Sequence, residues 1–143
     1  MPTYRLEHIN TEQDYYACFA VMKELRPHLT DPASFVAQAQ RQATQGYRLL
    51  AAWQDQQVKA LAGYRIQENF LYGRFLYVDD LITAADTRSS GLGARLINAL
   101  RDEARQQHCA NFVLDTALSN ALGQRFYYRQ GLLAIGMHFR QTL

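Results

Sequence analysis

The feature of this sequence that most limits how the chain can fold is a glycine-containing turn, Arg88-Ser89-Ser90-Gly91-Leu92-Gly93-Ala94. Before it, Leu76 to Thr83 is apolar apart from Asp79-Asp80, which is typical of a strand with one acidic interruption. After it, apolar residues recur at helical spacing from Leu92 to Leu100. The segment therefore predicts a strand, a tight turn and a helix in succession.

Such a turn can bind an anion. The first N–H groups of a helix have no intrahelical partners, and the helix dipole places partial positive charge there. Glycines allow the main chain to approach a ligand closely, so the turn predicts a site for phosphate or pyrophosphate, to which Arg88 adds a charge. The alternative is an ordinary turn in which Ser89 or Ser90 caps the helix.

Two better-known phosphate motifs do not fit this turn. The nucleoside-triphosphate loop needs Gly-Lys-Ser/Thr, which does not follow here. The dinucleotide motif needs a third glycine, and the small residue Ala94 stands two positions too early for it. The sequence therefore argues against ATP and NAD as ligands.

Composition indicates one ordinary globular domain spanning residues 1–143. Apolar residues make up 48% and charged residues 20% of the chain. The net charge of +2 is scattered, which gives no reason to expect a nucleic-acid partner. We see no secretory signal and no run of membrane-spanning length, so we expect a cytoplasmic protein that does not bind membranes.

The rest of the chain predicts alternating strands and helices. The first strand covers residues 4–9, and Thr11 and Asp31-Pro32 then begin two helices. The later elements are a hairpin over 47–68, the strand and helix around the glycine turn, a strand over 111–116, a helix over 121–130 capped by Asn120, and a closing strand or hairpin over 132–141. The fold class is α/β (mixed α+β), in the order β-α-α-β-β-β-α-β-α-β: one mixed, mostly antiparallel sheet with helices on both faces.

Two separated motifs resemble one known family. The first is the Arg-x-x-Gly-x-Gly turn between a strand and a helix, and the second is Asn120, Phe126-Tyr127 and Gly131-Leu132. In this order of elements they resemble the GNAT (GCN5-related) N-acetyltransferase family, closely from Leu76 to Leu132 and loosely before that. The resemblance implies the GNAT fold and an acyltransferase that moves acetyl from acetyl-CoA to a primary amine.

The resemblance also implies how acetyl-CoA, the cosubstrate, is held, with no metal. Main-chain amides of the turn would bind the pyrophosphate, the preceding strand would bind the pantetheine arm, and Asn120 would lie beside that arm. The residues concerned are Arg88, Ser89, Ser90, Gly91, Leu92, Gly93 and Ala94 at the turn, and Leu81, Ile82 and Thr83 on the strand.

Direct transfer needs a donor for the oxyanion, an acid and a base. The main-chain N–H of Leu81 or Ile82 is the expected oxyanion donor. The resemblance implies that Tyr127 protonates the leaving thiolate, although an aromatic side chain beside Phe126 is also explained by packing.

Asp80 and Asp115 are the expected catalytic carboxylates, with Glu68 and His138 as outside candidates. Strand alternation predicts that Asp79 points to the opposite sheet face from Asp80. The alternative is that an aspartate only pairs with an arginine such as Arg65, Arg74 or Arg125.

The acceptor is the least constrained part of this hypothesis. It is a small-molecule amine or a protein amino group, and a homodimer is compatible with the sequence. The rival function is a non-catalytic acyl-CoA-binding regulatory module. Residues that could line an acceptor pocket are Tyr15, Tyr16, Arg26, His28, Tyr64, Glu68 and Tyr72.

Overall fold

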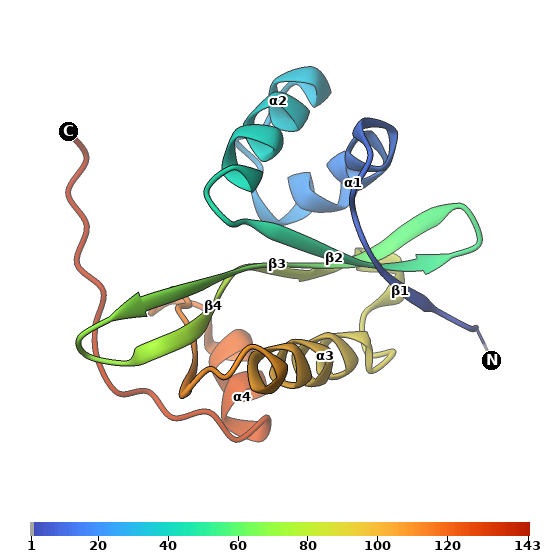
Figure 1. Cartoon of the computed structure of the whole chain (residues 1–143). Coiled ribbons are helices and arrows are strands. Elements are labelled where there is room, and N and C mark those ends of the chain that lie inside the picture. Colours follow the sequence, from blue (N-terminus) through green and yellow to red (C-terminus); the bar gives the residue numbers. More distant parts are fainter. Residues whose placement is uncertain (1) are drawn as a thin grey trace. The chain divides into compact units, whose positions relative to one another are not determined.

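A computed structural model describes residues 2–143, and the chain divides into two compact units, one reaching to Val113 and one spanning Leu114–Leu143. The order of elements follows the expected one as far as the last helix (Figure 1). The elements are β1 (Arg5–His8), α1 (Glu12–Leu25), α2 (Pro32–Ala43), β2 (Arg48–Gln54), β3 (Gln57–Asn69), β4 (Gly73–Thr83), the short 3-10 helix η1 (Ala85–Thr87), α3 (Leu92–Gln106), β5 (Asn111–Leu114) and α4 (Ala121–Arg129).

The strands form one sheet in the order β1-β2-β3-β4-β5. β1 pairs antiparallel with β2, β2 with β3, and β3 with β4, as the hairpin pattern predicts. Helices α1 and α2 lie on one face and α3 on the other (Figure 1). The core on the α1–α2 side includes Cys18, Val36, Leu49 and Leu61, each nearly inaccessible to solvent. The prediction of a mixed sheet covered on both faces is confirmed.

Side chains begin three of the helices at the predicted positions. Thr11 accepts a hydrogen bond from the Asp14 amide at 3.1 Å, Asp31 accepts one from the Ser34 amide at 3.0 Å, and Asn120 begins α4. Each of these bonds satisfies an amide that has no intrahelical partner. Among residues 2–143, none of the helices combines the length and the apolar character needed to cross a membrane.

The pairing of β3 with β4 contains a β-bulge. Gly63 lies opposite Asp80 and Tyr64 opposite Val78, so Asp79 is an extra residue on β4. An extra residue shifts the alternation of a strand by one position, for side chains and for main-chain groups alike. Beyond Val78, the bulge therefore decides which side chains lie on each face of β4 and which main-chain groups point to each neighbouring strand.

The expected closing strand over 132–141 is wrong. The described chain has no strand after β5, and residues 132–143 form neither helix nor strand. Leu133, Ile135, Met137 and Phe139 do alternate as strand residues would, but their exposed fractions lie between 68% and 83%. Alternation gives a segment one apolar face, yet a strand also needs a neighbouring strand for its N–H and C=O groups, and this segment has none within residues 2–143.

Candidate active site

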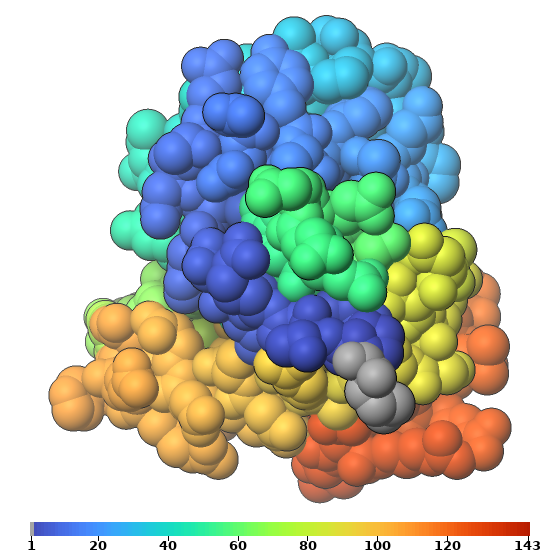
Figure 2. All heavy atoms as spheres, turned by 90° about the vertical axis from the view of Figure 1, so that its right-hand side faces the viewer, coloured from blue at the N-terminus to red at the C-terminus, as the bar shows by residue number. Residues whose placement is uncertain are grey.

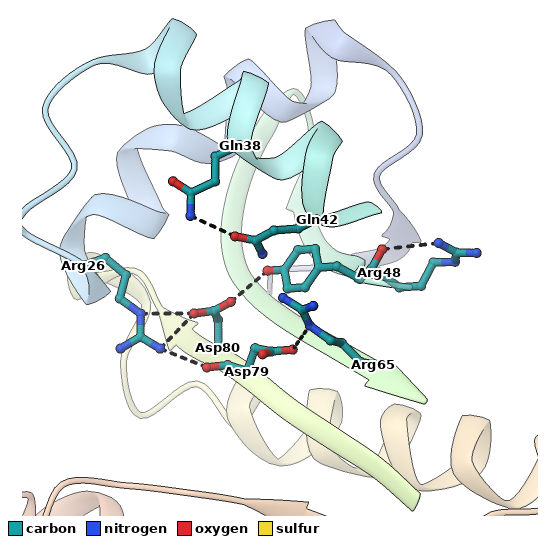
Figure 3. Close-up of polar contacts among 8 residues, drawn as sticks. Arg26, Gln38, Gln42, Arg48, Arg65, Asp79 and Asp80 are labelled. Carbon is teal, nitrogen blue, oxygen red and sulfur yellow. Dashed lines mark hydrogen bonds and ion pairs between the residues drawn. The ribbon is translucent and has the colours of Figure 1, made fainter. Parts of the chain in front are cut away.

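A cavity of about 250 Å³ opens on the α1–α2 side of the sheet. Helices α1 and α2, the connection between them, the start of β2, and strands β3 and β4 all contribute to its wall. Figure 3 shows most of its polar side chains, with Arg26 on one side of the two aspartates and Arg65 on the other. The polar lining residues are Arg26, His28, Gln38, Gln42, Tyr47, Arg65, Asp79 and Asp80, and the apolar ones are Met22, Leu29, Phe35, Ala39 and Leu49.

Asp80 lies at the centre of this network. One carboxylate oxygen, Oδ1, accepts hydrogen bonds from Arg26 Nε at 3.1 Å and from Arg26 Nη2 at 2.8 Å. The other, Oδ2, accepts one from the Tyr47 hydroxyl at 2.8 Å. Only 14% of the Asp80 side chain is exposed, and three donors hold its carboxylate in one orientation.

Asp79 lines the same cavity, which corrects the prediction that it points to the opposite face. Its Oδ2 accepts a hydrogen bond from Arg65 Nε at 3.1 Å, and its main-chain carbonyl accepts one from Arg26 at 2.9 Å. The physical reason is the bulge, because the extra residue brings two successive side chains to one face of β4. Burial raises the pKa of Asp79, the Arg65 guanidinium opposes that rise, and the Asp80 carboxylate adds to it.

Gly63 makes room for the Tyr47 side chain. A Cβ atom at Gly63 would stand 2.0 Å from the Tyr47 hydroxyl oxygen and 2.6 Å from Cζ of the ring. Tyr47 is buried, and burial, together with the nearby Asp80 carboxylate, raises its pKa well above the ordinary value. The phenol therefore stays protonated and donates to Asp80. Sequence reasoning missed both residues, because a tyrosine just before β2 and a glycine within β3 give no pattern that links them.

The other residues expected at an acceptor pocket are dispersed. Arg26 and His28 line the cavity, whereas Tyr15 lines a second cavity of about 370 Å³ beside β2. The Tyr64 hydroxyl forms a hydrogen bond with His8 at 2.8 Å, and Glu68 lies exposed near the end of β3. Within residues 2–143, no group of three or more His, Cys, Asp or Glu side chains is arranged to hold a metal ion.

The glycine turn lies where the sequence predicts it, between β4 and α3. Ser89 and Gly91 take left-handed angles, with φ of 66° and 83°, and Gly91 directly precedes α3. Ser90 Oγ lies 3.4 Å from the Leu92 amide, too far for a strong cap. In Figure 2 this turn (yellow) is part of the surface beside the β2–β3 turn (green) and β1 (blue). The first amides of a helix have no intrahelical partner, and with no strong side-chain cap at α3 this turn fits a pyrophosphate.

The end of β4 has an unpaired edge. The Ala110 amide bonds to the Arg74 carbonyl at 2.7 Å, which aligns the start of β5 with the start of β4. Since β5 ends at Leu114, no strand within residues 2–143 pairs with β4 on this side beyond about Val78. On the other side, Ala84 donates to Lys59 of β3 at 2.8 Å, so by alternation the Leu81 and Thr83 amides point away from β3. This edge fits an amide-containing arm such as pantetheine.

The second unit contains the other residues that the resemblance indicates. Tyr127 is half-buried on α4, and burial raises the pKa of its phenol. Asp115 Oδ2 lies 3.0 Å from His138 Nδ1, which brings two of the candidate bases together. The Asn120 side chain accepts a hydrogen bond from the Gly123 amide at 3.0 Å and fills the space where a Cβ at Gly123 would lie. Gly123 thus leaves room for the Asn120 side chain that caps this helix.

Comparison with known proteins agrees with this geometry. Residues 8–132 match the model of the acetyltransferase (GNAT) family. The chain is 25% identical to an uncharacterized N-acetyltransferase, YhdJ, of Bacillus subtilis (strain 168), over 85% of this chain and 86% of that protein.

Solved structures share the fold at lower sequence identity. A transcriptional regulator from Bacillus halodurans C-125 gives a TM-score of 0.87 at 16% identity, covering 99% of this chain and 100% of that one. The aminoglycoside N-acetyltransferase AAC(6')-Iy in complex with CoA gives 0.86 at 14% identity, covering 100% and 97%. The chain therefore belongs to the acetyltransferase (GNAT) family, and it is an acetyl-CoA-dependent N-acetyltransferase.

Proposed function

We propose that the 250 Å³ cavity binds the acceptor, a small primary amine, and that this amine attacks the acetyl-CoA thioester directly. The observation that carries the proposal is the bulge in β4. It brings the carboxylates of Asp79 and Asp80 into one cavity, at the point where the other edge of β4 loses its strand partner. A cationic amine and an acyl-CoA arm can therefore approach the same few residues from two sides.

The two aspartates differ in what they can do for the amine. Asp80, the expected base, has both oxygens engaged by Arg26 and Tyr47, which suits it to hold a fixed negative charge next to an ammonium group. Asp79 has one oxygen, Oδ1, without a hydrogen bond to any described residue, and its pKa is raised. We assign the proton from the ammonium group to the Asp79–Asp80 pair, with Asp79 accepting it directly or through a water molecule.

Main-chain groups would bind the cosubstrate. The amides from Ser89 to Ala94, with Arg88, are assigned to the pyrophosphate, and the edge from Leu81 to Thr83 to the pantetheine arm. Of the two expected oxyanion donors, Leu81 is favoured because its amide points away from β3, whereas that of Ile82 points toward it. One such donor contributes about 3–4 kcal/mol to transition-state stabilisation where it has been tested.

In the second unit, Tyr127 is assigned to protonate the CoA thiolate, and Asn120 to lie beside the CoA arm. Burial raises the pKa of Tyr127, so the phenol holds its proton at neutral pH, as a general acid must before the thiolate leaves. Asp115 is assigned to orient His138, whose other ring nitrogen is a second proton acceptor for the reaction.

The proposal extends to the chain as a whole. The family match crosses the boundary between the two units, which supports one N-acetyltransferase domain, and we propose a cytoplasmic location.

The exposed apolar residues of segment 132–139 support a homodimer. Light scattering on the Leu133→Ser/Ile135→Ser variant tests the dimer, and a monomeric wild type would refute it.

Release of CoA thiol from acetyl-CoA, measured on a panel of monoamines, polyamines, amino acids and peptides, tests the proposed acceptor site. We expect turnover with a small amine, and competition between that amine and other small amines. Transfer only to folded proteins would contradict the small-acceptor proposal. Tight CoA binding without turnover on the whole panel would instead favour the non-catalytic module.

A further inference from the structure

The guanidinium group of Arg65 has more hydrogen-bond donors than the protein uses. Arginine carries five N–H donors, and Arg65 gives the one on Nε to Asp79. Neither Nη1 nor Nη2 bonds to any residue that the structure describes, although only 19% of the side chain is exposed. No fully buried side-chain nitrogen or oxygen within residues 2–143 lacks a partner, so these two nitrogens reach accessible space.

The orientation of this guanidinium leaves the edge with Nη1 and Nη2 available to a ligand. Asp79 occupies Nε, and the Arg65 Cζ lies 5.5 Å from the centre of the Tyr47 ring, so the group is held on two sides. The edge that joins Nη1 and Nη2 is one of the two edges with which arginine binds a carboxylate or a phosphate through paired hydrogen bonds. Because Arg65 lines the cavity, an anion inside it can use that edge.

Helix α2 adds a neutral donor to the same cavity. Gln38 Nε2 donates to Gln42 Oε1 at 2.9 Å, which leaves the Gln42 amide nitrogen without a partner among the described residues. Both glutamines line the cavity, and Figure 3 shows them on the α2 side of the arginine–aspartate network.

The charges of the cavity suit a zwitterion better than a polycation. Two carboxylates face two guanidinium groups, so the formal charges of these four side chains cancel. An acceptor with several ammonium groups would meet Arg26 and Arg65 without a spare carboxylate for each added charge. The volume of about 250 Å³ is also below the ~300–1,000 Å³ typical of sites for drug-sized ligands.

We propose that the acceptor carries an anionic group, a carboxylate or a phosphate, beside its amine, and that the free edge of Arg65 binds this group. This inference rests on the proposed function of the cavity as the acceptor site. In the complex, the amine faces Asp79 and Asp80, while the anion lies against Arg65 and the Gln42 amide. Arg65 is then a specificity-determining residue for acetyl transfer.

The experiment compares acceptors that differ only in the anionic group. The kcat/KM for acetyl transfer is measured with β-alanine against n-propylamine, and with O-phosphoethanolamine against ethanolamine. We expect the anionic member of at least one pair to be favoured by about 10- to 100-fold, the range for a charge-assisted contact. The pair with the larger ratio identifies whether the anion is a carboxylate or a phosphate.

Two variants separate recognition of the anion from general damage. Arg65→Gln should reduce the favoured ratio to near one, and a ratio cancels any loss that both acceptors share. Arg74→Gln is the control, because Arg74 also lies in the sheet but donates to the Gln107 carbonyl at 2.6 Å and does not line the cavity. Its ratio should match that of the wild type.

The possible failures are distinguishable. Measurable transfer with ratios near one, or a preference for spermidine, would overturn this inference and leave the amine acceptor site intact. No transfer to any amine in the presence of bound acetyl-CoA would overturn the proposed function of the site, and this inference with it. An unchanged ratio in Arg65→Gln would remove Arg65 from anion binding.

Discussion

The acceptor cavity and the glycine turn are built from different parts of the chain. In the cavity, side chains meet from far apart in the sequence: Arg26 and Tyr47 reach Asp80 across 54 and 33 residues. At the turn, neighbouring residues shape the main chain, and Ser89 and Gly91 supply left-handed angles two positions apart. A site made of side chains fails when one atom is misplaced, whereas a main-chain site fails only when its backbone angles are lost.

The largest expected effect is that of Gly63→Ala, since it should lower both stability and activity. The new methyl group would overlap the buried Tyr47 ring and displace its hydroxyl from Asp80. We expect a loss of about 1–3 kcal/mol in unfolding free energy, the usual cost of overpacking, and a large fall in kcat/KM for the acceptor. Chemical denaturation and steady-state kinetics measure both.

Gly136→Ala is the matched control for this variant, since a Cβ at Gly136 meets no atom within 4 Å. It should leave stability and activity unchanged. If Gly63→Ala were as stable as the wild type, the Tyr47 ring would not be fixed against β3. The cavity would then not depend on accurately placed side chains, and its contrast with the glycine turn would fail.

Tyr127→Phe should have the next largest effect, on turnover alone. Loss of a general acid typically lowers the rate by about 10²- to 10⁴-fold, and the removed hydroxyl is not assigned to CoA binding. Single-turnover kinetics give the rate, and calorimetry gives the Kd for CoA. Turnover equal to that of the wild type would make Tyr127 a packing residue beside Phe126, with which its ring is in contact.

Gly91→Ala tests the main-chain site. A Cβ there meets no atom, so the cost is that of a left-handed backbone, about 1–2 kcal/mol. We expect the Kd for CoA to rise by about five- to tenfold with the acceptor KM unchanged. Ser89→Gly is the control, because glycine relieves the same strain, and CoA affinity should not weaken. If the acceptor KM changed and the CoA affinity did not, the turn and the cavity would not have the separate roles assigned to them.

The smallest effect expected is the pH dependence of stability at Asp79. Its pKa in the folded state lies above the ordinary value of 3.8, so the folded protein holds the proton more tightly than the unfolded chain does. The protonated form of Asp79 therefore adds to the free energy of unfolding. This contribution is fully present below the ordinary pKa and is lost as pH rises through the folded-state pKa. Relative to the wild type, Asp79→Asn should therefore gain stability as pH rises through that window.

Melting temperatures of both proteins across the acidic range measure this difference. Asp31→Asn provides a contrast, because the pKa of Asp31 is lowered by hydrogen bonds from Ser34, so its contribution is lost as pH falls. If the melting temperatures of wild type and Asp79→Asn changed in parallel with pH, the effect of burial on the pKa of Asp79 would be offset by another group.

The sequence by itself determined the elements whose signals are local. The caps at Thr11, Asp31 and Asn120, the hairpin of β2 and β3, and the glycine turn all follow from residues within a few positions of each other. The resemblance to the GNAT family depends on such local motifs, which is why the family could be identified from them. The assignments of Tyr127, Asp80 and Asp115 to catalysis stay predictions.

Only the tertiary structure decided what depends on pairing between distant segments. The bulge that turns Asp79 toward the cavity arises from the register of β4 against β3, and no local pattern specifies an unmatched residue. The space at Gly63 has meaning only once Tyr47 packs over it. Likewise, segment 132–141 alternates as a strand should. Alternation determines which face of a strand is apolar, but it does not specify the neighbouring strand that hydrogen bonds across a sheet require.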